Sequence, residues 1–137
     1  MQALTIASIV EKEVKGDEMP LVAGVIMNRL DKKMPLQMDS TVMYIHNISG
    51  RWTTTDKERQ SNSPYNTYKV KGLPPGPISN PGKAALLAAI NPTQHEYLYF
   101  VLIDPKTGKT AFAKTNEEHE ANRKKFQQWC QKNPGVC

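Results

Sequence analysis

Two glutamates, Glu11 and Glu13, lie in an otherwise apolar stretch near the N-terminus, where a carboxyl group can serve as a general acid. At about 100° per residue, the apolar side chains of residues 3–14 gather on one face of a helix, with Thr5 and Ser8 on the opposite face. Glu11 falls at the edge of the apolar stripe, and Glu13 falls inside it. Because an ionised carboxylate is costly to bury, such a side chain is paired with a cation, kept protonated, or exposed at the floor of a cleft. The pattern therefore leaves two interpretations open, a structural ion pair and acid–base catalysis.

The first part of the chain is expected to be helical and to position these glutamates. The first helix should end near Gly16, and a second should cover residues 16–33 with its own apolar face. A third, short helix is expected over residues 41–49, with Asp39 or Ser40 as its cap.

The second part of the chain combines a loop, a hairpin and two further helices. Prolines and glycines concentrated between residues 64 and 92 predict a long ordered loop, which ends in an apolar helix over residues 82–92. Strands over residues 97–103 and 109–115 flank a turn sequence and predict a β-hairpin, and a polar helix over residues 116–133 follows. This order of elements predicts an α+β fold.

The composition is that of one folded domain. A chain of 137 residues with 39% hydrophobic side chains has enough apolar material for one core but not for two, so residues 1–137 are expected to form a single domain, with residues 130–137 as a C-terminal tail. The net charge of +5 suits an anionic polymer as partner, and it equally suits a solvated basic surface. No apolar stretch approaches the length of a membrane span, and no signal peptide is evident. Because the helical pattern starts without a lead-in, we expect the chain to be a fragment of a longer protein.

The two cysteines give weak evidence about the compartment. Cys130 and Cys137 lie seven positions apart with a turn-forming Asn-Pro-Gly sequence between them, so a disulfide is sterically possible, but the pairing stays open. The cysteines and histidines show no spacing typical of zinc ligands.

Several separate blocks of the sequence share one resemblance. In chain order they read "ASIVEKE", "NRL", "MPLQMDSTVMY", "SPYNTY", "GLPPGPISNPG", "AAINP" and "YLYFV". Together they cover about residues 4–126 and resemble the catalytic domain of the endolytic murein transglycosylases, the YceG-like family. The resemblance implies a helical cleft domain of the lysozyme type with a small β-hairpin. It also implies a lytic transglycosylase that cleaves the β-1,4 bond between N-acetylmuramic acid and N-acetylglucosamine and leaves a 1,6-anhydromuramyl end.

The resemblance carries the catalytic role onto Glu13, which aligns with the glutamate of the Gln-x-Glu-Ser pattern in other lytic transglycosylases. Glu11 then takes the position of the glutamine and is a secondary candidate. Members of the family commonly have threonine where this chain has Val14, and usually have proline where it has Ser40.

The same resemblance indicates substrate-binding residues. Gln37 and Asp39 precede a helix and are suited to bind sugar hydroxyl or N-acetyl groups or to hold the acid, although Asp39 is equally suited to cap the helix. Tyr65, Asn66 and Tyr68 resemble the Tyr-Asn pair that lines the clefts of lytic transglycosylases. In that role Asn66 would hydrogen-bond an acetamido group and a tyrosine would stack on a sugar, while two alternating tyrosines also fit the core of a strand.

Three further polar residues are weaker candidates. Asn28 and Arg29 lie beyond the apolar stripe of the second helix and are secondary candidates for orienting the cleft, while a plain ion pair explains Arg29 equally well. His119, on the last helix, fits a surface or packing role better than a catalytic one.

The chemistry that the resemblance implies needs one carboxyl group. An ordinary glycosidase uses two, but here the attacking group would be the C6 hydroxyl of the substrate itself, which is already in place. No metal or organic cofactor is expected. Two alternatives stay open: a module that binds peptidoglycan without cutting it, and a lysozyme-like muramidase that uses Asp39 as second carboxylate.

The resemblance also implies where such a protein works. The expected partners are the glycan strands of peptidoglycan and proteins of cell-wall synthesis, with no nucleic acid. The expected location is the extracytoplasmic face of a bacterial cytoplasmic membrane, reached through an N-terminal anchor that is absent from this chain.

Overall fold

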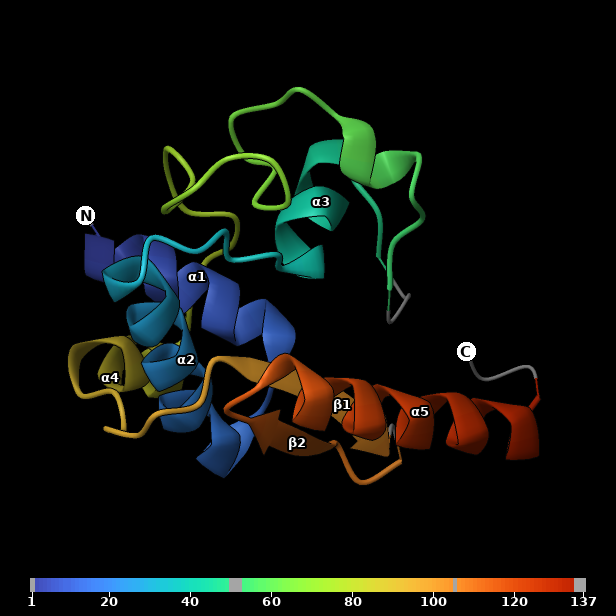
Figure 1. The fold of residues 1–137 in the computed structure, drawn as a ribbon. Helices are drawn as coiled ribbons and strands as arrows, with labels where there is room; N and C mark the ends of the chain where they lie inside the picture. The colour runs from blue at the N-terminus through green and yellow to red at the C-terminus, as the bar shows by residue number, and fades with distance from the viewer. Residues whose placement is uncertain (1, 50–52, 105, 135–137) are drawn as a thin grey trace.

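The computed structural model describes residues 2–49, 53–104 and 106–134, and its architecture confirms the predicted α+β class. In chain order the elements are α1 (Gln2–Glu13), η1 (Gly16–Glu18), α2 (Met19–Asp31), α3 (Asp39–His46), η2 (Glu58–Gln60), α4 (Lys83–Ile90), β1 (Tyr99–Asp104), β2 (Lys109–Ala113) and α5 (Asn116–Lys132). Figure 1 shows α1, α2 and α4 grouped together, with α3 and the long loop on one side of α1 and the hairpin with α5 on the other.

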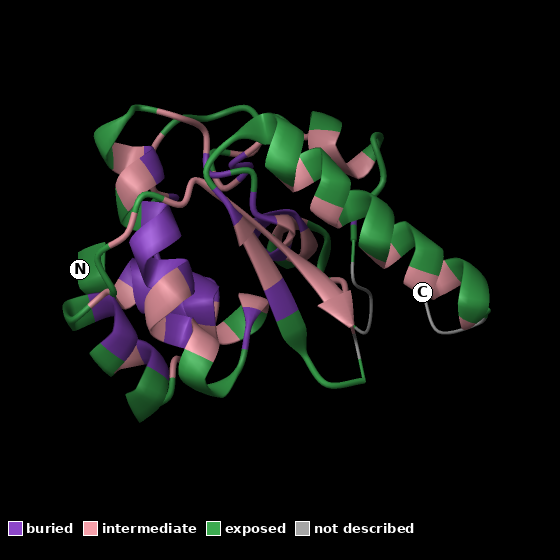
Figure 2. Cartoon of the chain, turned by 60° about the horizontal axis from the view of Figure 1, so that its bottom comes forward, coloured by how far each residue is buried: buried purple, intermediate pink, exposed green. Residues whose placement is uncertain are grey.

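The hydrophobic core lies among α1, α2 and α4. Fully buried Ile9 and Val10 of α1 and Val22 and Ile26 of α2 belong to it, and α4 adds a face of alanines. Small side chains let helix axes approach closely, which explains why the short α4 packs against both longer helices. In Figure 2 many of the buried residues gather in this group of helices.

One sequence prediction about α1 is wrong. Thr5 and Ser8 lie opposite the apolar face, where a polar residue is expected to be exposed, but both are buried. The Ser8 hydroxyl donates to the backbone oxygen of Thr5 at 2.7 Å and accepts from the backbone N–H of Ile78 at 3.0 Å. The proline-rich loop therefore covers the supposed outer face of α1, and its backbone needs polar partners there because a buried N–H must be paired.

The helix α3 and residues 53–82 pack together on one side of the helical core and form what is called here the α3 wall. α3 begins at Asp39, so Asp39 and Ser40 lie inside its first turn and Met38 takes the cap position predicted for them. The loop that follows contains no regular strand among its described residues, apart from one isolated bridge between Pro35 and Lys71. This bridge fastens the segment before α3 to the loop that packs behind it.

The hairpin and α5 lie on the other side of the helical core and form the α5 wall. β1 and β2 pair antiparallel with Tyr99 opposite Ala113, and the turn between them includes Gly108 at φ +75°, a conformation that glycine adopts readily. Both predicted strands and the predicted last helix are thereby confirmed. Thr115 caps α5 by accepting from the Glu118 N–H at 3.2 Å, so the helix has a defined start on the sheet. α5 packs on β1 and buries none of its residues fully.

Two further points concern the cysteine pair and membrane-spanning helices. The possible pairing of Cys130 with Cys137 involves a residue outside the described ranges and stays open. Within residues 2–49, 53–104 and 106–134, no helix has the length and apolarity required to cross a bilayer.

Candidate active site

A groove of about 860 Å³ separates the α3 wall from the α5 wall. Its α3 side includes Ser40, Met43 and Tyr44, at positions i, i+3 and i+4 on one face of the helix, and Asn47 just past the helix end. Its α5 side has the same kind of spacing, with His119, Arg123, Phe126 and Gln127. Two helix faces therefore form the sides of the groove, and the C-terminal end of α1 contributes Glu13 to it.

Glu13 is the last residue of α1 and is partly buried in the groove. Its Oε2 accepts the backbone N–H of Ser40 at 3.1 Å. Ser40 lies in the first turn of α3, where backbone N–H groups have no partner within the helix, so Glu13 satisfies one of these free donors. The contact joins the end of α1 to the start of α3 and fixes one oxygen of the carboxyl group.

Burial raises the pKa of the Glu13 carboxyl from 4.5 to about 7. The side chain and backbone N–H of Ser40 lower this pKa by favouring the charged form, while the negative charge of Asp39 raises it. The Ser40 hydroxyl acts here by proximity, since its buried Oγ lies outside hydrogen-bond geometry with any described residue. The balance leaves a carboxyl group that carries its proton close to neutral pH, which a general acid requires.

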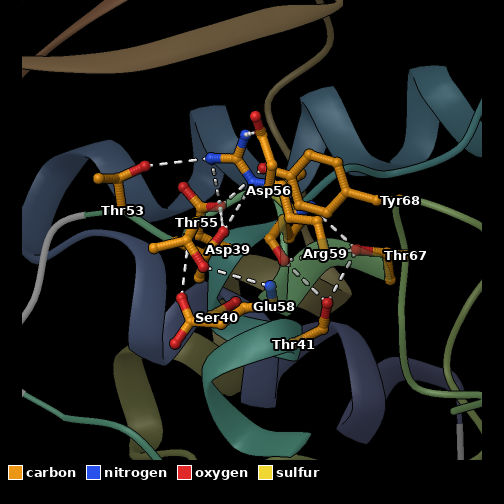
Figure 3. A network of polar contacts seen from close by, with 12 residues as sticks. Asp39, Ser40, Thr41, Thr53, Thr55, Asp56, Glu58, Arg59, Thr67 and Tyr68 are labelled. Atoms are coloured by element: carbon orange, nitrogen blue, oxygen red, sulfur yellow. Dashed lines mark hydrogen bonds and ion pairs between the residues drawn. The ribbon is translucent and has the colours of Figure 1, made fainter. Parts of the chain in front are cut away.

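Asp39 lies beside this carboxyl group and is held by three donors from the long loop. Two of these donors, Arg59 and Tyr68, are labelled in Figure 3. Its Oδ1 accepts from the Tyr68 hydroxyl at 2.7 Å and from the Thr54 hydroxyl at 2.7 Å. The Nη2 of Arg59 lies 3.4 Å from the same oxygen and completes an ion pair. Asp39 therefore fastens the loop to the start of α3, next to Glu13.

Arg59 organises the loop around Asp39. Its Nε donates to the Thr54 hydroxyl at 2.7 Å, and its guanidinium carbon lies 4.8 Å from the centre of the Tyr68 ring, within range of a cation–π interaction. Burial and the neighbouring Asp39 carboxylate raise the pKa of the Tyr68 hydroxyl, so Tyr68 stays a hydrogen-bond donor at neutral pH. Arg59, Asp39 and Tyr68 all line the groove.

The deepest charged residue of the groove is Arg29, which is only 5% exposed. It donates to the backbone oxygens of Leu98, Pro35 and Leu36 at 2.6, 2.7 and 3.1 Å, and its guanidinium lies 4.9 Å from the centre of the Tyr99 ring. Burial lowers the pKa of Arg29 below its ordinary value. Arg29 therefore ties α2 to the hairpin and to the segment before α3 by hydrogen bonds to carbonyl groups, in place of the ion pair considered from the sequence.

His119 belongs to the α5 wall and stacks on Tyr99, with ring centres 4.9 Å apart. Burial, with a further contribution from Arg123, lowers its pKa from 6.5. The ring is therefore neutral and packed against the sheet, in line with the packing role expected for it.

Comparisons with known proteins agree on one family. Residues 1–125 match the YceG-like family. The chain belongs to this family. It is 42% identical over 127 residues to a Bacillus subtilis protein named endolytic murein transglycosylase, and 40% identical over 126 residues to a protein of the same name from Streptococcus pneumoniae D39. The matches cover 90% and 88% of this chain but only 34% and 23% of those relatives.

A solved structure shows the same fold. A YceG-like protein from Listeria monocytogenes is similar with a TM-score of 0.81 and 48% sequence identity, over 87% of this chain and 38% of that one. The chain therefore spans well under half the length of the relatives that it matches.

The YceG-like chain brings five of the predicted site residues to one groove: Glu13, Arg29, Gln37, Asp39 and Tyr68. Gln37 is exposed and adopts φ +53°, a left-handed conformation that is unusual for a residue with a side chain. Its backbone N–H donates to the Thr67 oxygen at 3.1 Å, so the loop behind α3 holds it in that conformation.

The other four predicted residues do not line the groove and have partners elsewhere. The Glu11 Oε1 accepts the N–H of Gly82 at 2.6 Å, at the N-terminus of α4, where a negative charge is favourable. The Asn28 amide donates to the backbone oxygens of His95 and Tyr97 at 2.8 and 2.9 Å.

Asn66 and Tyr65 lie behind the groove wall. Asn66 is fully buried, donates to the backbone oxygens of Arg59 and Ser61 at 2.8 Å each, and accepts the Tyr68 N–H at 3.1 Å. The Tyr65 ring packs on the core and lies 5.1 Å from the Tyr44 ring. Both residues therefore shape the loop that presents Tyr68.

Sequence reasoning missed Arg59 and Tyr44 as groove residues. Arg59 lies in a polar stretch that carries no periodic signal, and its partner Asp39 is 20 positions away, so no local pattern joins them. Tyr44 was visible in principle, because it follows Ser40 by one helical turn and so shares its face. Among the described residues, no group of three or more histidine, cysteine, aspartate or glutamate side chains is arranged to hold a metal ion.

Proposed function

We propose that this chain is the catalytic region of an endolytic lytic transglycosylase that cuts the glycan strands of peptidoglycan. The observation that carries the proposal is Glu13, a carboxyl group with a pKa of about 7 that lines a large groove. Family membership supports it, since relatives that match most of this chain are named endolytic murein transglycosylases. The proposed bond is the β-1,4 linkage from N-acetylmuramic acid to N-acetylglucosamine.

In the proposed reaction Glu13 acts first as acid and then as base. Its proton passes to the glycosidic oxygen as the bond from that oxygen to C1 of the muramyl residue breaks, which gives a free hydroxyl on the leaving sugar. The C6 hydroxyl of the same muramyl residue then attacks C1 and returns its proton to the Glu13 carboxylate. The product is a 1,6-anhydro ring, no water is consumed, and the acid is regenerated.

The contact with Ser40 assigns the two oxygens of Glu13 different tasks. Oε2 accepts the Ser40 N–H at 3.1 Å, so we propose that Oε1 carries the proton and faces the glycosidic oxygen. An N–H that is already in position costs no reorganisation when the carboxylate forms. Ser40 thus supports the base form, while burial supports the acid form.

Asp39 is better suited to hold the site than to react. Its Oδ1 accepts from Tyr68, Thr54 and Arg59, and these donors hold the carboxylate in place and stabilise its charge, which makes it a weaker nucleophile and base. This favours the transglycosylase over a muramidase that would need Asp39 as second carboxylate. We propose that Gln37, together with the Asp39–Tyr68 pair, binds polar groups of the sugar beside Glu13.

The proposal needs no cofactor, because one carboxyl group supplies both proton transfers. The substrate places the protein on the extracytoplasmic side of a bacterial membrane, where it would work beside proteins of cell-wall synthesis.

The proposal is tested by digesting purified peptidoglycan sacculi with this chain and with two variants. Glu13→Gln keeps the shape and the contact to Ser40 but removes the acid, so it should release at least a thousandfold less soluble glycan. The matched control is Glu11→Gln, two residues away on the same helix, which should keep the parent activity. Equal activity of Glu13→Gln and the parent would refute the assignment of Glu13.

Sedimentation with sacculi separates catalysis from binding alone. Glu13→Gln should still sediment with sacculi, because the groove is intact. If the parent also binds sacculi but releases no glycan, the chain is a binding module and the enzymatic proposal is wrong.

A further inference from the structure

The groove continues along α3 beyond the site of Glu13. Ser40 contacts Glu13, Met43 and Tyr44 lie about one turn further on, and Asn47, just past the end of the helix, lines the groove as well. At 1.5 Å per residue, the path from Ser40 to Asn47 extends about 10 Å. A chain molecule bound at Glu13 therefore has room to run along this wall.

Tyr44 is the prominent side chain of this extension. It is 48% exposed although it is a large hydrophobic residue on a short helix. Its ring lies 5.1 Å from the ring of Tyr65 at an angle of 40°, and Tyr65 in turn packs against the core. One side of Tyr44 is thus supported by a fixed ring, while much of its surface stays open to the groove.

Folding does not explain this exposure. An exposed aromatic ring gains little from burial, and the ring pair by itself contributes only a modest stabilisation. A ring that is held firmly and exposed at a groove is, in contrast, a good binding surface, because little side-chain entropy is lost when a ligand covers it.

We propose that Tyr44 forms a second sugar-binding subsite, one helical turn along α3 from the residue that contacts Glu13, where its ring stacks on the apolar face of a pyranose residue of the glycan strand. This inference rests on the proposed function for the identity of the strand. A β-linked N-acetylhexosamine has an apolar C–H face and a polar rim, so an aromatic ring and a few amide groups complement it. Asn47 on the same wall and Gln127 on the α5 wall supply amides for the rim.

The subsite gives the groove a preference for long strands. A sugar bound at Tyr44 leaves the sugar at Glu13 in the interior of the strand, which favours cleavage inside it. Tyr44 binds substrate and transition state alike, so its loss raises KM and leaves kcat at saturation unchanged.

The experiment measures binding in the Glu13→Gln background, where no turnover occurs, with peptidoglycan-derived glycan strands of defined length. Tyr44→Ala should weaken binding of long strands about tenfold, and Tyr44→Phe should stay within about twofold of the parent. Tyr44→Leu, which keeps apolar bulk but loses the flat ring, should bind as weakly as Tyr44→Ala. Because Tyr44 is half-exposed, these variants are expected to fold, and circular dichroism checks this.

The matched control is Leu87→Ala, a truncation on α4 of another large hydrophobic residue, 50% exposed and outside the groove. It should bind long strands like the parent. Unchanged binding by folded Tyr44→Ala would overturn the subsite, and so would an equal loss for Leu87→Ala, because either result makes the ring irrelevant to specific binding. An equal loss for a disaccharide would overturn it too, since a disaccharide held at Glu13 does not need the extension.

The subsite and the proposed function fail in different ways. If Glu13→Gln binds strands through Tyr44 but the parent makes no anhydro product, the function is wrong and the subsite stands. If the parent cuts sacculi and Tyr44→Ala has the parent KM and kcat on long strands, the subsite is wrong and the function stands.

Discussion

The raised pKa of Glu13 predicts that the proposed catalytic group destabilises the fold at alkaline pH. The carboxyl has a pKa of about 7 in the folded protein and 4.5 as its ordinary value, so the folded state binds more protons between these two pH values. The contribution of protonated Glu13 to folding stability is therefore fully present below about pH 4.5 and is lost as the pH rises through about 7. This is the reverse of the behaviour of an aspartate or glutamate in a salt bridge, and the Glu13→Gln substitution removes it.

The magnitude follows from the shift of about 2.5 pKa units, the difference between about 7 and 4.5. At about 1.4 kcal/mol per unit, the cost of ionising Glu13 in the folded protein reaches about 3 kcal/mol at pH 8. At pH 5 most of this cost is absent and about 1 kcal/mol remains. Glu13→Gln should therefore gain about 2 kcal/mol of stability relative to the parent between pH 5 and pH 8.

The assay is urea unfolding of the parent and of Glu13→Gln at several pH values from 5 to 8, followed by circular dichroism. Comparing the same pair at different pH values cancels any constant effect of the new amide group. Glu11→Gln serves as control, because it makes the same change of carboxyl to amide on the same helix but outside the groove. A stability difference between parent and Glu13→Gln that is independent of pH would refute the reasoning from burial.

Three further predictions concern residues around the groove and the core. The Ser40 hydroxyl and N–H both lower the pKa of Glu13, so Ser40→Ala should shift the alkaline limb of the kcat/KM profile to higher pH. Ser40→Pro also removes the N–H and should shift this limb further, whereas an unshifted profile would contradict the contact between Ser40 and Glu13. Gly24→Ala should lower the unfolding free energy, measured in urea titrations, by at least about 2 kcal/mol. The new Cβ would lie 2.3 Å from the Thr93 oxygen, and this clash outweighs the gain in helix propensity of about 1 kcal/mol. Glu11→Ala should lower the melting temperature by an amount that corresponds to about 1 kcal/mol, since the N-terminus of α4 loses its acceptor, and an unchanged melting temperature would argue against this role.

The helices and the hairpin were predictable because their signals are local. The period of apolar residues defines α1 and α2, and the turn with Gly108 joins two strands of apolar residues. The position of Glu13 within the apolar stripe also came from the sequence, and the structure places this residue at the groove. In each of these cases the residues that carry the information are neighbours in the chain.

The rest depends on contacts between distant segments. The burial of Ser8 could not be predicted, because nothing in the sequence of α1 shows that the loop around Ile78 covers the face opposite its apolar residues. Asn66 was assigned to substrate binding from a motif, but the loop encloses it and uses its amide for backbone contacts. The site of Asp39 depends likewise on Arg59 and Tyr68, whose approach results from loop packing. Helical and strand periodicity contains no information about such contacts.

The central claim is that a single carboxyl group, Glu13, cuts the strand while the muramyl C6 hydroxyl takes the place of water. It is tested most directly by digesting sacculi with this chain in water enriched in heavy oxygen and analysing the new ends by mass spectrometry. The account predicts 1,6-anhydromuramyl ends that contain no heavy oxygen, and no such ends with Glu13→Gln. Reducing muramyl ends that carry heavy oxygen would contradict it.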